Sequence, residues 1–222
     1  MAYSPALLLS SIDSDSKIGT AILYIVRHAE VALDKTKTIR GLMNPGLDDK
    51  GKEDAQGLVE FFKDIELSAI YTDDLKRAYQ TALPVAYDKD ITIEIDPELR
   101  SWDVGTELEG EKIEDHEDDI AELRQQPDKV PVGGQSWGDY GEQINGALSH
   151  YIGIGLESSN PVLIVTHGSA IQIIWESLGE ELDNVEEYAD IPVEPAGVMA
   201  VYPTRFGMKV KILKGEGENE DA

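Results

Sequence analysis

The chain has 222 residues, of which 41% are hydrophobic, and this is enough apolar material to bury one sizeable core. Its 44 acidic and 19 basic residues give a formal net charge of -25, which opposes binding to nucleic acid and to anionic lipid. It has no cysteine and no apolar run of about 18 residues, so disulfides, thiolate metal sites and a membrane-spanning helix are all excluded. We therefore expect one domain in the cytoplasm, without nucleic-acid or membrane partners.

The elements alternate between strand and helix along the chain. Residues 21–26 form a continuous apolar run with branched side chains, which is typical of a strand covered on both faces. From Asp48 the apolar residues recur at helical spacing, and Asp48 or Asp49 is placed to cap that helix. The later patterns predict strands at 68–71, 91–95, 162–166, 197–202 and 208–213, and helices at 74–86, 140–151 and 169–178. This order predicts an α/β fold, a three-layer sandwich with a mostly parallel central sheet flanked by helices.

Segment 97–138 differs from the rest because it is rich in Gly, Pro and acidic residues, with one helix expected near 113–126. We interpret it as an insertion that covers the sheet edge and the site. The domain itself is expected at 21–213, after an N-terminal extension at 1–20 and before a disordered acidic tail at 214–222. The excess of acid is compatible with an ordinary solvated surface and with salt adaptation, and both explanations stay open.

Two of the four histidines directly follow buried-type strands: His28 after the first apolar run, and His167 after residues 162–166. In such sheets, ligands bind at the carboxyl ends of the strands. Cations also gather around His28 in an otherwise acidic chain, namely Arg27, Lys35, Lys37 and Arg40. This indicates an anion site, although exposed cations that neutralise nearby acids would give the same pattern.

Several blocks in the right order resemble the histidine phosphatase superfamily, which also contains the phosphoglycerate mutases. The two histidine blocks, Arg27-His28-Ala29-Glu30 and Val165-Thr166-His167-Gly168, are similar to its two histidine motifs. Residues 71–82 resemble its Ser-Ser-Xaa-Xaa-Xaa-Arg-Ala-Xaa-Gln-Thr-Ala block, with Arg77 at the arginine. Weaker similarities are found at 44–55 and at 133–136, so that the resemblance spans roughly 22–202. It implies a phosphoglycerate mutase-like fold.

The resemblance also implies a chemistry, that of a phosphomonoester hydrolase in which His28 accepts the phosphoryl group. An imidazole nitrogen attacks phosphorus only when it is neutral, and guanidinium groups bind the charged oxygens without losing their own charge. Arg27 and Arg77 are the expected phosphate ligands, and His167 is the expected additional hydrogen-bond donor. Arg40 joins them because Ile39-Arg40-Gly41 resembles the family's Arg-Gly pair. A small phosphorylated substrate is expected, and no metal and no cofactor.

Two positions depart from the family pattern. The usual proton donor is a glutamate, but the matching position is Ser101, so Asp103, the nearest carboxylate, is the expected general acid; a solvated loop acid is the alternative reading. Asp34 falls roughly where the family tends to place an asparagine, and its carboxylate would repel phosphate if it pointed inward.

Two other functions remain open at this point. A mutase would use the same pocket, but superfamily mutases carry a longer and more basic cap than the acidic segment 101–128. A non-catalytic phosphate-ligand binder would explain the absence of the glutamate at Ser101. The particular phosphoester and the oligomeric state are not determined by the sequence.

Overall fold

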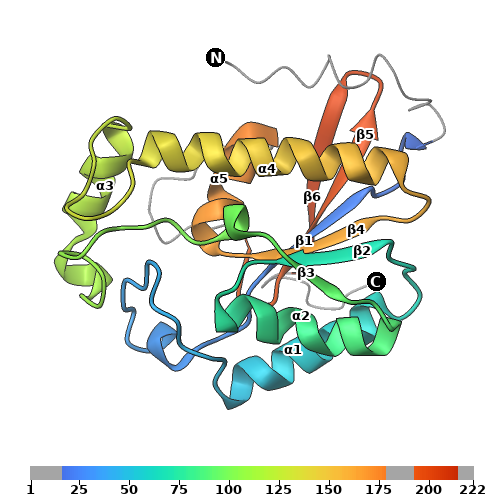
Figure 1. Cartoon of the computed structure of the whole chain (residues 1–222), viewed down its shortest axis with the longest axis horizontal. Helices are drawn as coiled ribbons and strands as arrows, with labels where there is room; N and C mark the ends of the chain where they lie inside the picture. The colour runs from blue at the N-terminus through green and yellow to red at the C-terminus, as the bar shows by residue number, and fades with distance from the viewer. Residues whose placement is uncertain (1–16, 179–192, 215–222) are drawn as a thin grey trace, which may run out of the picture.

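The computed structural model describes residues 17–178 and 193–214, which form an α/β structure around one sheet (Figure 1). The strands are β1 (Leu23–Arg27), β2 (Ala69–Thr72), β3 (Ile93–Ile95), β4 (Val162–Thr166), β5 (Val198–Thr204) and β6 (Gly207–Lys214). Their order across the sheet is β3-β2-β4-β1-β5-β6. The first four are parallel, whereas β5 runs antiparallel to β1 and to β6. The prediction of a mostly parallel sheet is confirmed.

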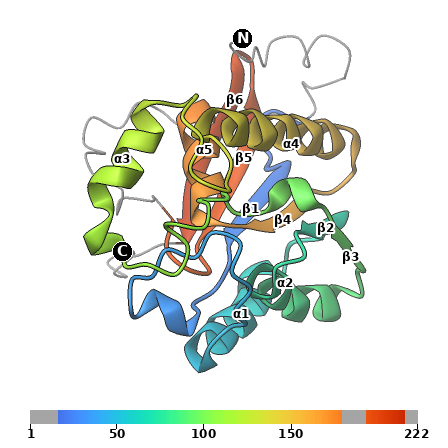
Figure 2. The ribbon, with the colours of Figure 1, turned by 60° about the vertical axis from the view of Figure 1, so that its left-hand side comes forward.

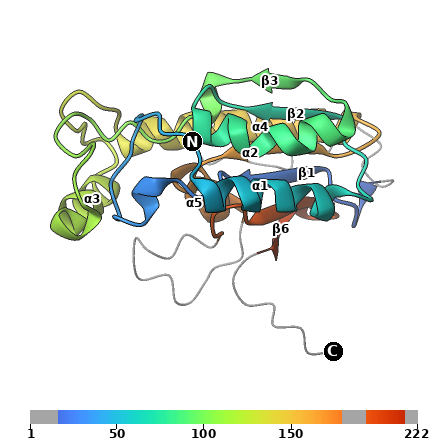
Figure 3. The ribbon, with the colours of Figure 1, turned by 90° about the horizontal axis from the view of Figure 1, so that it is seen from below.

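Helices cover both faces of this sheet, as Figures 1 and 3 show. On one face lie α1 (Asp49–Phe62) and α2 (Lys76–Lys89), and on the other lie α4 (Trp137–Glu157) and α5 (Gly168–Leu178). The remaining helical pieces are α3 (Glu117–Gln125) and the short 3-10 helices η3 (Ala32–Asp34), η4 (Pro97–Leu99) and η5 (Ile113–Asp115). The helix expected at 113–126 is therefore two pieces. They separate at His116, which leaves the helical conformation with φ -136° and ψ 21°.

The alternation of side chains along β1 explains why its sequence is apolar throughout. Leu23 and Ile25 pack into the core beneath α4 and α5, whereas Tyr24 and Val26 pack into the core beneath α1 and α2. Each fully buried side chain of this size stabilises the fold by about 1.5–3 kcal/mol. A strand buried on both faces must lie in the interior of the sheet, and this position places its carboxyl end beside β4.

The start of α1 lies against the loop that follows β1. The Asp48 side chain accepts a hydrogen bond from the backbone N–H of Gly51 at 2.8 Å, which confirms Asp48 as the N-cap, a contact worth about 1 kcal/mol. A Cβ at Gly51 would lie 2.0 Å from the carbonyl oxygen of Glu30, so that only glycine permits this approach. The cap and the glycine together hold the loop after β1 in place.

Segment 97–138 lies at the carboxyl end of the parallel strands, with α3 on the same side as the loop after β1 (Figures 2 and 3). Its buried side chains share the core of α4 and α5, and these include Trp102, Leu108, Ile120 and Leu123. The segment is thus packed onto the strand ends rather than along the edge strand β3. The expected extension and acidic tail lie, for residues 1–16 and 215–222, outside the described residues. Among those described, no helix is both long and apolar enough to cross a membrane.

Candidate active site

The ends of two adjacent parallel strands, β1 and β4, bring the two sequence-predicted histidines together. Arg27 of β1 is in register with Thr166 of β4, and the next residue along each chain segment is a histidine. The backbone N–H of His28 donates to the Thr166 carbonyl at 2.8 Å, and the ring centroids of His28 and His167 lie 5.2 Å apart. Both residues are 1% exposed. The two imidazoles are therefore close enough to contact one tetrahedral anion.

His28 is held in the tautomer that nucleophilic attack requires. Its Nδ1 lies 2.8 Å from the carbonyl oxygen of Ala29, and because a carbonyl only accepts, Nδ1 must carry the proton. Burial is the largest cause that lowers the pKa of His28 well below 6.5, and the nearby guanidiniums of Arg40, Arg77 and Arg27 and the ring of His167 lower it in addition. The ring is therefore neutral at pH 7, with the lone pair of Nε2 free.

Arg77 is buried beside the histidines and links them to the loop after η3. Its Nε donates to Nδ1 of His167 at 3.1 Å, and its two terminal nitrogens donate to the carbonyls of Gly41 and Met43. Burial lowers its pKa to about 10, so the guanidinium remains charged at neutral pH. Three of its five N–H groups are used by these contacts, and two remain for an oxyanion.

Two further residues of the block 71–82, Thr81 and Gln80, hold the loops around Arg77 in position. The Thr81 hydroxyl donates to the carbonyl of Arg77 at 2.7 Å and accepts the backbone N–H of Ala29 at 2.9 Å. The Gln80 side chain accepts the backbone N–H of Leu47 at 2.8 Å. The first turns of α2 thus hold both the residue after His28 and the loop before α1.

Arg27 and Arg40 add positive charge to the same cavity. The Arg27 guanidinium lines it and donates to the carbonyl of Val193 at 3.0 Å. Arg40 forms an ion pair with Asp34, whose second carboxylate oxygen accepts the N–H of Val31 at 2.7 Å. Asp34 does line the cavity, and the repulsion anticipated for its carboxylate is offset by Arg40.

The cavity has a volume of about 560 Å³, which is a typical size for a small-molecule site. Two imidazoles and three guanidiniums line one part of it. Segment 97–138 contributes further lining residues, which include Ser101, Trp102, Glu117 and Asp118. The cationic part has the charge and the donor geometry to bind a phosphoryl group.

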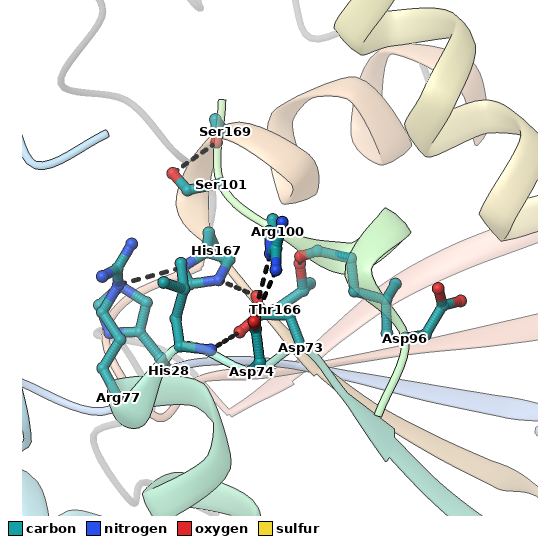
Figure 4. Close-up of polar contacts among 12 residues, drawn as sticks. His28, Asp73, Asp74, Arg77, Asp96, Arg100, Ser101, Thr166, His167 and Ser169 are labelled. Carbon is teal, nitrogen blue, oxygen red and sulfur yellow. Dashed lines mark hydrogen bonds and ion pairs between the residues drawn. The ribbon is translucent and has the colours of Figure 1, made fainter. Parts of the chain in front are cut away.

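The structure does not bring the predicted acid Asp103 to this cavity. Its carboxylate accepts the backbone N–H of Gly105 at 3.1 Å, and Asp103 is not one of the lining residues. Ser101, at the position of the family glutamate, does line the cavity and lies 3.4 Å, between hydroxyl oxygens, from Ser169 (Figure 4). The Ser169 hydroxyl in turn lies 3.0 Å from that of Tyr140. A cluster of hydroxyl groups therefore occupies the expected place of the carboxylate.

Asp73 is a site residue that sequence reasoning missed. It is completely buried, and one carboxylate oxygen contacts Nε2 of His167 while the other accepts the N–H of Leu75 at 2.7 Å (Figure 4). The sequence did contain a sign of it. Asp73 stands where the family's Ser-Ser-Xaa-Xaa-Xaa-Arg block has its second Ser, so a carboxylate replaces a hydroxyl there. In the part of the chain that is described, no group of three or more His, Asp or Glu side chains is arranged to hold a metal ion.

Comparison with known proteins gives one family. Residues 23–214 match the family model of the histidine phosphatase superfamily (branch 1). A probable phosphoglycerate mutase of Cronobacter sakazakii is 29% identical over 154 residues, covering 67% of this chain and 70% of its own. Phosphoserine phosphatase 1 of Hydrogenobacter thermophilus is 31% identical over 130 residues, covering 57% and 62%.

Solved structures agree on the fold. A mycobacterial glucosyl-3-phosphoglycerate phosphatase, solved in complex with VO3, superposes with a TM-score of 0.70 at 18% identity, covering 87% of this chain and 98% of its own. An Escherichia coli protein described as a putative alpha-ribazole-5'-P phosphatase gives a TM-score of 0.69, also at 18% identity, covering 90% and 98%. At this level of identity the likeness concerns the fold.

Proposed function

Since the chain belongs to the histidine phosphatase superfamily, we propose that it hydrolyses small phosphomonoesters through a phosphohistidine on His28. The observation that carries this proposal is the neutral imidazole of His28, with Nδ1 committed to the Ala29 carbonyl and Nε2 free, 5.2 Å from the ring of His167. Attack on phosphorus also needs positively charged groups that bind the phosphoryl oxygens. The arginines at positions 27, 40 and 77 line the same cavity as His28 and provide these charges.

The reaction has two steps. In the first, the lone pair of His28 Nε2 attacks phosphorus, a P–N bond forms, and the ester P–O bond breaks as the leaving oxygen takes a proton. In the second, water attacks phosphorus and the P–N bond breaks, which releases phosphate and restores His28. Arg27, Arg40, Arg77 and His167 neutralise the charge on the phosphoryl oxygens in both steps.

The source of the first proton is a separate question. Asp103 can serve only if its carboxylate leaves the N–H of Gly105 and turns into the cavity. With the carboxylate where it is, the leaving oxygen is protonated from solvent or from a group on the cavity wall, where Ser101 and Glu194 lie. Protonation by Ser101 would be inefficient, because a hydroxyl is a weak acid at neutral pH.

Rapid quenching with a 32P-labelled phosphoester tests the nucleophile. Wild type should trap an acid-labile, base-stable protein adduct, and His28→Ala should trap none and lose at least about 10³-fold in turnover, as expected when a nucleophile is removed. His150→Ala, at a histidine on α4 that does not line the cavity, is the matched control and should trap the adduct. An adduct on His28→Ala would contradict the proposal.

A phosphoglycerate mutase is the second candidate, because several relatives bear that name, including the Cronobacter protein. The same phosphohistidine could return its phosphoryl group to another hydroxyl of the substrate. Phosphoglycerate should be assayed for isomerisation and for phosphate release together, beside phosphoserine, glucosyl-3-phosphoglycerate and alpha-ribazole phosphate, which the names of relatives suggest. Isomerisation faster than phosphate release would favour the mutase. Tight binding with no turnover of any of these would instead favour a non-catalytic binder.

We further propose that a small phosphorylated metabolite is the partner of this site and that the chain acts in the cytoplasm. The net charge of -25 supports a partner other than nucleic acid or an anionic membrane, and the lack of cysteine is compatible with a reducing compartment.

A further inference from the structure

Asp73, His167 and Arg77 form a continuous line of buried contacts beside His28 (Figure 4). The Asp73 carboxylate contacts Nε2 of His167, and Nδ1 of the same ring accepts the Nε–H of Arg77 at 3.1 Å. All three residues are at most 1% exposed. Because Nδ1 accepts, the proton of the neutral ring lies on Nε2 and is donated to Asp73.

The charged and titratable groups that face His167 come from four different segments of the chain. Asp73 follows β2, Arg77 lies on α2, Arg40 lies in the loop after η3, and His28 follows β1. Burial is the largest cause that lowers the pKa of His167; Asp73 raises it, Arg77 and Arg40 lower it, and the net pKa is about 4. In the free enzyme at neutral pH the ring is therefore neutral.

A bound phosphoryl group changes this balance, because its negative charge offsets the guanidiniums that face the ring. The Nε–H of Arg77 then turns from Nδ1 of His167 to the bound anion, and Nδ1 takes a proton from solvent and donates it in a hydrogen bond to a phosphoryl oxygen. The imidazolium so formed lies between two anions, the phosphoryl group and the Asp73 carboxylate. A serine hydroxyl, which the family block has at this position, would supply no negative charge.

We propose that Asp73 is a positioning residue whose carboxylate lets His167 take up one proton when a phosphoryl group binds. The proposal rests on the proposed function, since it concerns the same anion pocket, but its test needs no turnover. Asp73 touches neither the nucleophile nor, by the contacts described, the cavity; it acts through His167.

Sulfate is a suitable probe because it is a tetrahedral dianion whose charge is constant between pH 5 and 9. Calorimetric titration in buffers of different ionisation heat counts the protons taken up per sulfate bound. Wild type should take up close to one proton at pH 6–7, with a Kd that rises by up to about tenfold per pH unit. Asp73→Asn, which keeps the shape but not the charge, should take up few protons and flatten this pH dependence.

The neighbouring carboxylate Asp74 is the matched control. It is paired with Arg100 and does not line the cavity, so Asp74→Asn should retain the uptake of wild type. Asp73→Ser, which restores the family residue, should behave like Asp73→Asn. His28→Ala should still take up the proton when sulfate binds. This result would show that the protonated group is His167 and not His28.

Three results would overturn the proposal: no uptake in wild type, equal uptake in wild type and Asp73→Asn, or uptake lost in His28→Ala alone. If neither Asp73 variant folds, the 15N NMR shifts of the His167 ring in sulfate-bound wild type provide the test. A neutral ring in that complex would contradict the proposal. If no substrate is hydrolysed in a phosphatase assay, the proposed function is wrong. The number of protons taken up per sulfate bound does not depend on that result.

Discussion

The Thr81 hydroxyl accepts the backbone N–H of Ala29 at 2.9 Å, which ties the helix that carries Arg77 directly to the residue after His28, the proposed nucleophile. The carbonyl of the same Ala29 accepts the proton of His28 Nδ1 at 2.8 Å. One peptide segment therefore sets both the position and the tautomer of His28. The relationship also gives the threonine in the second turn of α2 a role beside the proposed phosphate ligand Arg77.

Replacing Thr81 by valine should lower both stability and activity. The buried N–H of Ala29 would lose its partner, which costs about 1–3 kcal/mol in the free energy of unfolding. The shift of Ala29 should also misplace His28 and reduce kcat by about tenfold, since small misplacements of a reacting group are costly. Urea unfolding and steady-state kinetics measure the two effects. Thr81→Ser keeps the hydroxyl and should remain close to wild type, whereas equal effects in both variants would count against this role.

Ser101→Glu should accelerate hydrolysis of alkyl phosphates, because it replaces a hydroxyl on the cavity wall by a carboxyl. General acid catalysis contributes about 10²–10⁴-fold when it is well placed, and an untuned donor should give about tenfold. The rate with p-nitrophenyl phosphate should change little, since that leaving group departs without a proton. The ratio of kcat/KM for the two substrates is the measurement, and an unchanged ratio would show that protonation does not limit the wild type.

Asp103→Asn should leave kcat within about twofold for both kinds of substrate, since its carboxylate accepts the N–H of Gly105 away from the cavity. The comparison uses the same two substrates, with Glu194→Gln as a matched change at a carboxylate that does line the cavity. A loss confined to the alkyl phosphate in Asp103→Asn would restore Asp103 as the general acid, as the sequence suggested.

Acid should destabilise the fold through the two buried imidazoles. The folded-state pKa of His167 is about 4, and that of His28 is also well below the 6.5 of the unfolded chain. Between these values the unfolded state binds more protons, so the free energy of unfolding falls as the pH drops below about 6.5. His167 alone should account for about 3 kcal/mol by pH 4. Urea titrations from pH 7.5 to 4 should therefore show a smaller fall for His167→Gln than for wild type.

A matched substitution separates this effect from the titration of the many carboxylates. His116 contacts Asp119 at the start of α3 and does not line the cavity. His116→Gln should therefore follow the wild-type curve. If His167→Gln loses as much stability on acidification as wild type, the buried ring is not the cause.

Most strands and helices could be predicted from the sequence, because they depend on patterns among residues that are close together in the chain. The run at 21–26 indicates a doubly covered strand by its composition alone, and β4 occupies residues 162–166 as the pattern predicts. Asp48 is recognised as a cap because capping involves only neighbours in sequence. The placement of His28 and His167 follows from the rule that parallel strands end at a common edge.

The sequence by itself determined which strands carry histidines at their carboxyl ends, since that depends only on local order along the chain. Only the tertiary structure decided which side chains meet there: it put Asp73 behind His167, paired Asp34 with Arg40, and turned Asp103 away from the cavity. The physical reason is that side-chain contacts between distant segments depend on the register of neighbouring strands and on the path of the loops. Neither of these leaves a periodic trace in the sequence.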